Sequence, residues 1–367
     1  MVTTLDELRL LTVTRNLFNV TTLKRALDRL GFVQADPIRA PARAQDLVLR
    51  HRVKGYRAGD LERRYTELDV HEDYFVNYGF VTGSLRQLMH PRTIPAKSGR
   101  AWTAAESRQA RRVMEFVRDR KEVHPKEVEA RFSQGTIINY WGGSSNATTR
   151  LLDEMHYRGM LDVVRRESGI RIYTPGTLAA AAADAAMRHA RLDSLVDAAV
   201  GIYAPLPGAS LSSLVRRLRY GAPQWSGELA GAVRRARERL EHARVDGIDW
   251  YWPAEWDAAP RPAVDEVRLL APFDPVVWDR DRFELLWGWT YRFEGYTPAS
   301  RRTRGYYALP LLWRDRVIGW GNLSVTDGTL EAEIGYVTTK PRSRTFTLEL
   351  EAELDRIRVF LGLPLQA

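Results

Sequence analysis

The chain has 367 residues, 44% of them hydrophobic, which excludes a largely disordered protein and predicts two or more packed units. It contains no cysteine, so disulfides, thiolate zinc sites, iron–sulfur clusters and cysteine nucleophiles are excluded. The formal net charge of +9 favours a polyanionic partner, nucleic acid before membrane, because lysine and arginine displace counterions from phosphates.

The first predicted elements are a helix, a turn, a second helix and a strand. Apolar residues recur at helical spacing over residues 5–18. Thr22 is placed to cap a second helix, and Gly31 is a typical stop for it. Residues 32–36 predict a short strand, because they are rich in β-branched and aromatic side chains and Pro37 closes them. This is the order in which a winged helix begins.

The same order is clearer between Thr103 and Pro175. Three helices and two strands are predicted, over residues 103–120, 124–132, 144–159, 160–166 and 170–174. Ser144 or Ser145 is the expected cap of the third helix, and Gly159 is its stop. The two strands are joined by a tight turn that contains glycine.

A third, weaker copy of this order runs from about Leu178 to Pro253. It consists of an alanine-rich helix, a helix capped by Ser210, a helix over 227–245 and an aromatic strand at 248–252. The proline-rich stretch from Pro253 to Val264 marks a boundary. Beyond it, four short strands and a closing amphipathic helix are predicted, over residues 267–273, 306–313, 316–325, 329–337 and 346–362.

We therefore expect an α+β protein of tandem winged-helix (helix-turn-helix) domains, followed by a small C-terminal β-barrel or sheet domain with a terminal helix. Four domains are predicted: a first winged-helix unit with an extension, a second and a third winged helix, and the β-domain, over residues 1–100, 101–177, 178–255 and 262–367. Several DNA-binding units in one chain need no partner subunit, so we expect a monomer.

Other classes of protein have no support in the sequence. No apolar run approaches the roughly 20 residues of a membrane-spanning helix, and the N-terminus lacks the layout of a signal peptide, so a cytoplasmic, nucleoid-associated protein is expected. The histidines are scattered singly, and no phosphate-loop or dinucleotide-binding motif is present. We expect neither a metal ion nor a cofactor.

Two basic clusters are candidates for DNA contact. Arg165 and Arg166 stand at the tip of the predicted wing, where guanidinium groups reach phosphates or a narrow minor groove. A solvated basic turn is the equal alternative. Arg301, Arg302 and Arg304 precede two tyrosines, and this mixture of charge and aromatic rings is frequent in nucleic-acid interfaces. The alternative for them is an exposed loop before two core tyrosines.

A third basic segment follows the predicted strand 32–36 directly. Its cations are Arg39, Arg43, Arg50, Arg52 and Lys54. A phosphate bound there would lie next to Gln34 and Asp36, which share one face of the strand because strand side chains alternate. A carboxylate and a carboxamide then stand side by side. From periodicity alone, the alternative is that Asp36 only caps the turn before proline and that Gln34 is solvated.

The residues around this pair resemble a known family. The sequence QADPI (34–38), continued by residues 43–49, is similar to the glutamine-x-aspartate stretch of the YcaQ/AlkX type of winged-helix DNA glycosylases, which are related to the AlkZ type. APFDPVVWDRDR (271–282), EGYTPASRR (294–302) and GYYALPLLW (305–313) look like the C-terminal signatures of that family, in the same order. The resemblance thus covers most of the chain.

This resemblance implies an enzyme of DNA repair: a monofunctional DNA glycosylase that hydrolyses the N-glycosidic bond of N7-alkylated purines in duplex DNA and unhooks interstrand crosslinks. The first and third residues of the motif are catalytic in the family, which carries over to Gln34 and Asp36. Asp36 would stabilise the oxocarbenium-like sugar and activate a water that Gln34 positions. No lysine lies in the motif to form a Schiff base.

The chain departs from the family pattern at Gln45, Asp46, Glu72, Asp73 and Arg304. These departures concern the choice of lesion more than the type of reaction. The rival interpretation is a non-enzymatic winged-helix transcriptional regulator. Several winged units in one chain argue against it, because regulators more often pair one unit per subunit across a two-fold axis.

Overall fold

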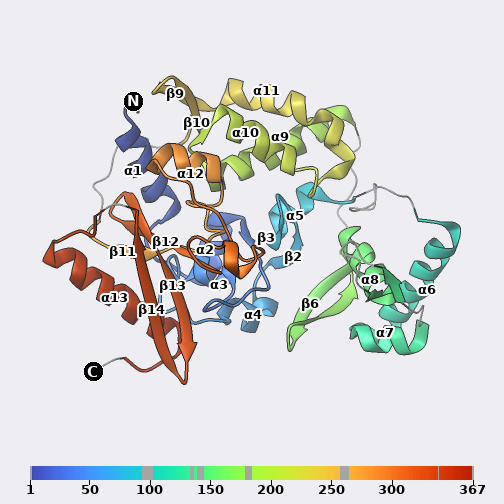
Figure 1. Cartoon of the computed structure of the whole chain (residues 1–367). Helices are drawn as coiled ribbons and strands as arrows, with labels where there is room; N and C mark the ends of the chain where they lie inside the picture. Colours follow the sequence, from blue (N-terminus) through green and yellow to red (C-terminus); the bar gives the residue numbers. More distant parts are fainter. Residues whose placement is uncertain are drawn as a thin grey trace. The chain divides into compact units, whose positions relative to one another are not determined.

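The computed structural model describes residues 2–92, 102–132, 136–138, 144–177, 184–256, 264–337 and 339–365 (Figure 1). The chain divides into two compact units. Unit 1 consists of Met1–Asp60, Asp197–Leu214 and Val233–Ala367, and unit 2 consists of Leu61–Val196 and Val215–Ala232. The chain leaves unit 1 and returns to it twice, so residues far apart in the sequence can meet within one unit.

The N-terminal part of unit 1 has the predicted order of helix, helix and strand. Its elements are α1 (Leu5–Asn16), α2 (Leu23–Leu30), β1 (Phe32–Gln34) and α3 (Ala44–Leu49). The side chain of Thr22 accepts a hydrogen bond from the backbone N–H of Arg25 and so caps α2. Gly31 ends this helix at a φ of 66°, a conformation that glycine adopts at little cost. The capped helix and its glycine stop are confirmed.

The C-terminal part of unit 1 is an antiparallel sheet of four strands with helices beside it. Its elements are β11 (Val267–Leu269), α12 (Arg280–Trp287), η3 (Ala299–Arg301), β12 (Leu309–Trp313), β13 (Arg316–Thr326), β14 (Thr329–Tyr336) and α13 (Arg344–Leu361). The strand order is β11-β12-β13-β14, and α13 packs against β11 (Figure 1). The sheet is a curled half-barrel with β11 and β14 at its edges. The sheet and the terminal helix are confirmed, whereas α12 was not predicted.

Unit 2 begins with a hairpin that was not predicted. Its first elements are α4 (Asp60–Arg63), η1 (Tyr65–Glu67), β2 (Val70–Tyr74), β3 (Tyr78–Thr82) and α5 (Gly83–Met89). β2 and β3 pair antiparallel, with Val70 opposite Thr82 and Tyr74 opposite Tyr78. The hairpin places Glu72 and Asp73 inside the unit, and both are buried.

The next segment of unit 2 follows the prediction closely. Its elements are α6 (Ala104–Arg120), α7 (Pro125–Phe132), β4 (Thr136–Ile138), β5 (Ser144–Asn146), α8 (Ala147–Tyr157), β6 (Leu161–Glu167) and β7 (Ile170–Pro175). Thr103 and Glu106 form a capping box at the start of α6. The predicted cap of α8 is wrong, because Ser144 and Ser145 belong to β5, which pairs with β4.

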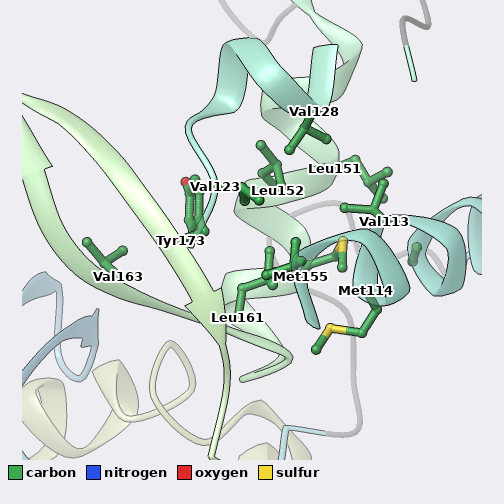
Figure 2. Close-up of a cluster of buried hydrophobic side chains, with 12 residues drawn as sticks. Val113, Met114, Val123, Val128, Leu151, Leu152, Met155, Leu161, Val163 and Tyr173 are labelled. Carbon is green, nitrogen blue, oxygen red and sulfur yellow. The ribbon is translucent and has the colours of Figure 1, made fainter. Parts of the chain in front are cut away.

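Helices α6, α7 and α8 and the β6–β7 hairpin enclose a hydrophobic core, shown in Figure 2. Val113 and Met114 come from α6, Val128 from α7, and Leu152 from α8. Val163 and Tyr173 stand on the two strands of the hairpin. The apolar stripes of the helices therefore face one another and the hairpin, which stabilises the arrangement by removing apolar surface from water.

Residues 184–256 belong partly to each unit. Their elements are α9 (Ala185–Tyr203), β8 (Leu206–Pro207), α10 (Gly208–Arg217), η2 (Pro223–Glu228), α11 (Leu229–Arg239), β9 (Glu241–Val245) and β10 (Ile248–Trp252). Ser210 does not cap α10, because this helix begins at Gly208. The helix predicted over 227–245 ends at Arg239, and residues 241–245 pair with β10 instead.

Three of the predicted features touch residues that the structure does not describe. These are the end of the first unit's extension, the start of the alanine-rich helix and most of the proline-rich boundary, at residues 93–101, 178–183 and 257–263. In the parts of the chain that are described, none of the helices combines the length and apolar character needed to cross a bilayer.

Candidate active site

Gln34 and Asp36 lie at the end of β1, in unit 1. Gln34 is the last residue of the strand, and Asp36 follows two residues later. Both side chains are largely withdrawn from solvent, with Gln34 5% and Asp36 9% exposed. Burying a carboxylate and a carboxamide lowers the stability of the fold unless both are hydrogen-bonded. Such groups are often retained because they have a function.

Trp278 fixes the orientation of the Gln34 side chain. The indole Nε1–H donates to Gln34 Oε1 at 2.9 Å, across 244 positions of sequence. Because an indole N–H can only donate, the atom that faces it must be the carboxamide oxygen. Within the described part of the chain, neither the NH₂ group nor the second lone pair of Oε1 has a further partner. Trp278 itself packs against Tyr203, with 4.5 Å between the ring centroids.

The carboxylate of Asp36 is held by one of its two oxygens. Asp36 Oδ1 accepts the backbone N–H of Ile38 at 2.9 Å, so the turn-capping geometry expected as an alternative is present. No hydrogen bond to Oδ2 is formed by the described residues. Burial raises the pKa of Asp36 above its usual value, and the N–H of Ile38 only partly opposes this. The side chain is thus a carboxylate of increased basicity with one oxygen available.

Two tyrosines of the segment 293–307 interact electrostatically with this carboxylate. Burial raises the pKa of Tyr296 and that of Tyr307, and the negative charge of Asp36 raises both further. Phe293 packs edge-on against both rings, with centroid distances of 5.8 and 5.3 Å. Tyr296 is 78% exposed, whereas Tyr307 is buried. Neither tyrosine was singled out from the sequence, although both lie in the stretches that resemble the family.

Gly295 explains why this segment can approach the strand end. A Cβ atom at position 295 would lie 3.2 Å from Ile38 Cδ1 and 2.5 Å from Phe293 Cζ. A side chain at this position would therefore force the Phe293 and Ile38 side chains to shift. The sequence places EGY here because the contact leaves no room for a larger residue.

Glu294 organises the turn that carries the basic cluster. Its carboxylate accepts the backbone N–H groups of Thr303 at 2.9 Å, Arg304 at 2.8 Å and Gly305 at 3.2 Å, and the Thr303 hydroxyl at 2.7 Å. Burial opposes ionisation, but these four donors outweigh it and lower the pKa of Glu294 to about 2. The carboxylate is therefore ionised throughout the working range of pH.

Asn322 holds the other side of the same turn. Its Nδ2–H donates to the carbonyl oxygen of Arg304 at 2.7 Å. Gly305 has a φ of 122°, and a Cβ atom there would lie 2.3 Å from Asn322 Oδ1. Only glycine fits this position, on both conformational and steric grounds.

Replacing Glu294 by glutamine should destabilise the protein at pH 7 by about 3 kcal/mol, the scale of a fall in pKa from 4.5 to about 2. The folded-state pKa is depressed, so the stabilisation is present above the unfolded-state pKa, near 4.5, and is lost as pH falls toward 2. Thermal unfolding of Glu294→Gln and wild type at pH 7 and pH 3 should show a Tm difference that shrinks at the lower pH. The exposed Glu284→Gln is the control, and a difference independent of pH would contradict the assignment.

The side chains of Arg50 and Arg52 are buried inside unit 1. Arg52 is completely buried and binds both oxygens of Asp274, at 2.7 and 3.0 Å. Arg50 donates to Glu353 at 2.5 Å and to the carbonyl oxygen of Leu269 at 2.8 Å. A guanidinium in these positions cannot reach a phosphate. The prediction that Arg50 and Arg52 contact DNA is therefore wrong.

The two arginines of the β6–β7 hairpin are bound to acidic side chains within unit 2. Arg166 donates to both oxygens of the buried Glu72, at 2.6 and 2.5 Å. Arg165 forms ion pairs with Glu122 and with Glu167, the latter at 2.7 Å. Direct phosphate contact by either residue would need these ion pairs to break.

The remaining cations divide into exposed and half-buried ones. Arg39, Lys54 and Arg301 are exposed to solvent. The half-buried ones are Arg43, at the N-cap position of α3, Arg302, 4.9 Å above the Tyr306 ring, and Arg304, 4.9 Å above the Trp289 ring. Unit 1 thus contains the candidate pair. Six of the ten residues predicted to contact DNA also lie in unit 1 with their side chains accessible to solvent.

The other departures from the family pattern are buried polar residues. Gln45 and Asp46 lie in α3, where Asp46 Oδ1 accepts the hydroxyl of Tyr56 at 2.7 Å. Asp73 is buried against Arg92, at 2.7 Å, and against His90. Glu72 binds Arg166, as described above. These residues support the fold around them, each within its own unit.

Two comparisons relate this chain to known proteins, one through its sequence and one through its structure. Residues 27–360 match the family described as DNA glycosylase AlkZ-like. The structure is similar to that of the Streptomyces sahachiroi DNA glycosylase AlkZ, with a TM-score of 0.63 over 99% of this chain and 98% of that chain. The two sequences are 15% identical, so this likeness concerns the fold.

Proposed function

We propose, from the premise that this chain belongs to the AlkZ-like DNA glycosylase family, that it is a monofunctional enzyme which hydrolyses the N-glycosidic bond of N7-alkylated purines in duplex DNA. The observation that carries the proposal is the pair at the end of β1. There a buried carboxylate with one available oxygen stands beside a carboxamide whose orientation is fixed by Trp278. Such a pair suits the activation of one water molecule.

An N7-alkylated purine already carries positive charge, so it leaves readily. The bond from the purine to C1′ breaks, and its electron pair neutralises the departing base. The water oxygen bonds to C1′, and a proton of the water passes to Asp36. The negative charge of Asp36 also stabilises the developing oxocarbenium ion, while the NH₂ group of Gln34 holds the water without competing for its proton.

We also propose that tandem winged helices hold the duplex, in the four-domain division set out from the sequence. The support is the order of elements: helices followed by an antiparallel hairpin occur at residues 104–175 and again at 185–252. Arg39, Lys54 and Arg301 would contact phosphates, because their side chains are exposed. Interstrand crosslinks through purine N7 present the same cationic leaving group, so their unhooking belongs to this proposal.

The test is base release from a duplex that contains 7-methylguanine. The enzyme should leave abasic sites, which alkali converts into strand breaks, without needing a metal ion or cofactor. Treatment with borohydride should trap no covalent complex, because the motif offers no lysine. A winged-helix regulator would give no breaks and would instead prefer a particular undamaged sequence, and that result would refute the proposal.

A further inference from the structure

Tyr307 has a buried hydroxyl group that the fold does not use. The residue is 3% exposed, and its Oη has no hydrogen-bond partner among the described residues. Buried hydroxyl groups are nearly always paired, because an unpaired one loses its hydrogen bonds to water without compensation. A buried donor left open in this way is therefore available to an acceptor of the candidate site.

The position of Tyr307 relates it to Asp36. Its ring packs edge-on against Phe293, at 5.3 Å between centroids. Gly295 lies between Phe293 and Ile38, because a Cβ atom on it would be 2.5 Å from Phe293 Cζ and 3.2 Å from Ile38 Cδ1. The backbone N–H of Ile38 holds one oxygen of Asp36. The phenol thus belongs to the aromatic cluster of Phe293, Tyr296 and Tyr307, which adjoins the turn that holds the carboxylate.

Tyr291, elsewhere in unit 1, provides the contrast. It is buried, as Tyr307 is, but its hydroxyl donates to the carbonyl oxygen of Ala308 at 2.6 Å. The fold therefore satisfies one of two buried phenols and leaves the other open. We propose that the Tyr307 hydroxyl is the hydrogen-bond donor that orients the Asp36 carboxylate during base release, which makes Tyr307 a positioning residue.

The charges around both groups agree with this role. Asp36 faces Tyr296 and Tyr307, and Tyr307 in turn faces Asp36, Tyr291, Arg280 and Tyr296. Burial, and next to it the charge of Asp36, raises the pKa of Tyr307, so its phenol keeps its proton and remains a donor. A donor directed at the open oxygen of Asp36 favours the ionised form that must receive the proton of the water.

The inference rests on the proposed function, and Tyr307→Phe tests it. This variant should release 7-methylguanine about 10- to 100-fold more slowly in single turnovers, the loss expected for a hydrogen bond to a charged group. Without the donor, the pKa of Asp36 should rise further, so the acidic limb of the pH–rate profile should move to higher pH. The Tm should stay equal or increase, since the variant removes an unpaired buried group.

Tyr291→Phe is the matched control, because it removes a buried phenol oxygen that has a partner. It should lower the Tm and leave both the rate of base release and the acidic limb unchanged. A variant of Tyr307 that releases base at the wild-type rate with an unmoved acidic limb would overturn the inference. So would a slower variant with a lower Tm and an unmoved limb, because that pattern describes a merely structural residue.

A second readout separates this inference from the proposed function. The pKa of Asp36 can be measured by NMR titration of protein labelled with ¹³C at its aspartate carboxyl groups, with Asp36→Asn identifying the resonance. If wild type releases no base, the proposed function fails, yet the titration still decides the role of Tyr307. An Asp36 pKa that is equal in wild type and Tyr307→Phe overturns the inference whatever the activity.

Discussion

Replacing Asp36 by asparagine should slow the release of 7-methylguanine by about 10²- to 10³-fold, the usual loss when a preorganised electrostatic group is removed. The substitution keeps the shape of the side chain and the oxygen that accepts the N–H of Ile38, but it removes both the negative charge and the site that receives the proton. Duplex binding, measured by fluorescence anisotropy on an undamaged duplex, should change little.

The same variant should be at least as stable as wild type at neutral pH. Burial raises the folded-state pKa of Asp36, so the stability linked to this group is fully present below its unfolded-state pKa and is lost as pH rises through the folded value. At neutral pH the buried charge therefore destabilises the folded state, and asparagine removes this destabilisation. Loss of activity together with an equal or higher Tm would identify a residue kept for function.

Asp28→Asn is the control for the change in net charge. Asp28 lies in α2, is exposed, and pairs with Lys24 at 2.8 Å. Its replacement should leave base release unchanged. If Asp36→Asn retained wild-type activity on the methylated duplex, the assignment of Asp36 as the central carboxylate would be wrong.

Replacing Asp274 by alanine should destabilise the fold by about 3–5 kcal/mol, because it leaves the buried guanidinium of Arg52 without its counter-charge. Asp274 is completely buried, binds Arg52 through both oxygens, and also accepts the backbone N–H of Val276 at 3.0 Å. Urea unfolding, followed by far-ultraviolet circular dichroism, measures the loss as a lower midpoint with an unchanged slope.

Arg39→Ala is the companion variant for this experiment. Arg39 comes from the same basic segment as Arg52 but is exposed, so its loss should leave the unfolding midpoint within about 0.5 kcal/mol of wild type. A similar small effect for Asp274→Ala would mean that Arg52 is not held as the structure places it. In that case its predicted contact with DNA would stand again.

The parts of the fold that were predictable from the sequence are those with local causes. Thr103 and Glu106 mark the start of α6, and Gly169 marks the turn of the β6–β7 hairpin. The helix predicted over 227–245 was too long, because its alanines and arginines favour a helix throughout. The sequence does contain a signal for the turn that ends β9, because Asp-Gly is a typical two-residue hairpin loop. Asp246 and Gly247 both adopt positive φ there.

The candidate site was predictable only where it is contiguous. Gln34 and Asp36 stand two residues apart, so alternation along the predicted strand 32–36 was the reason to expect them together. The strand ends at Gln34, and Asp36 lies beyond it. The contact of Gln34 with Trp278 joins residues 244 positions apart, and that of Arg52 with Asp274 joins residues 222 positions apart. Periodicity and spacing carry no information on such pairs. For that reason a structural ion pair was mistaken for a DNA contact, and the aromatic cluster was missed.

The turn at 303–305 is tied to Glu294 on one side and to Asn322 of β13 on the other. A segment fixed at both sides meets its ligand already ordered, so association there need not meet the entropic cost of immobilising a loop. If the neighbouring arginines bind DNA as proposed, the affinity they contribute is set by desolvation and ionic strength, and the duplex rather than the protein is the partner that deforms.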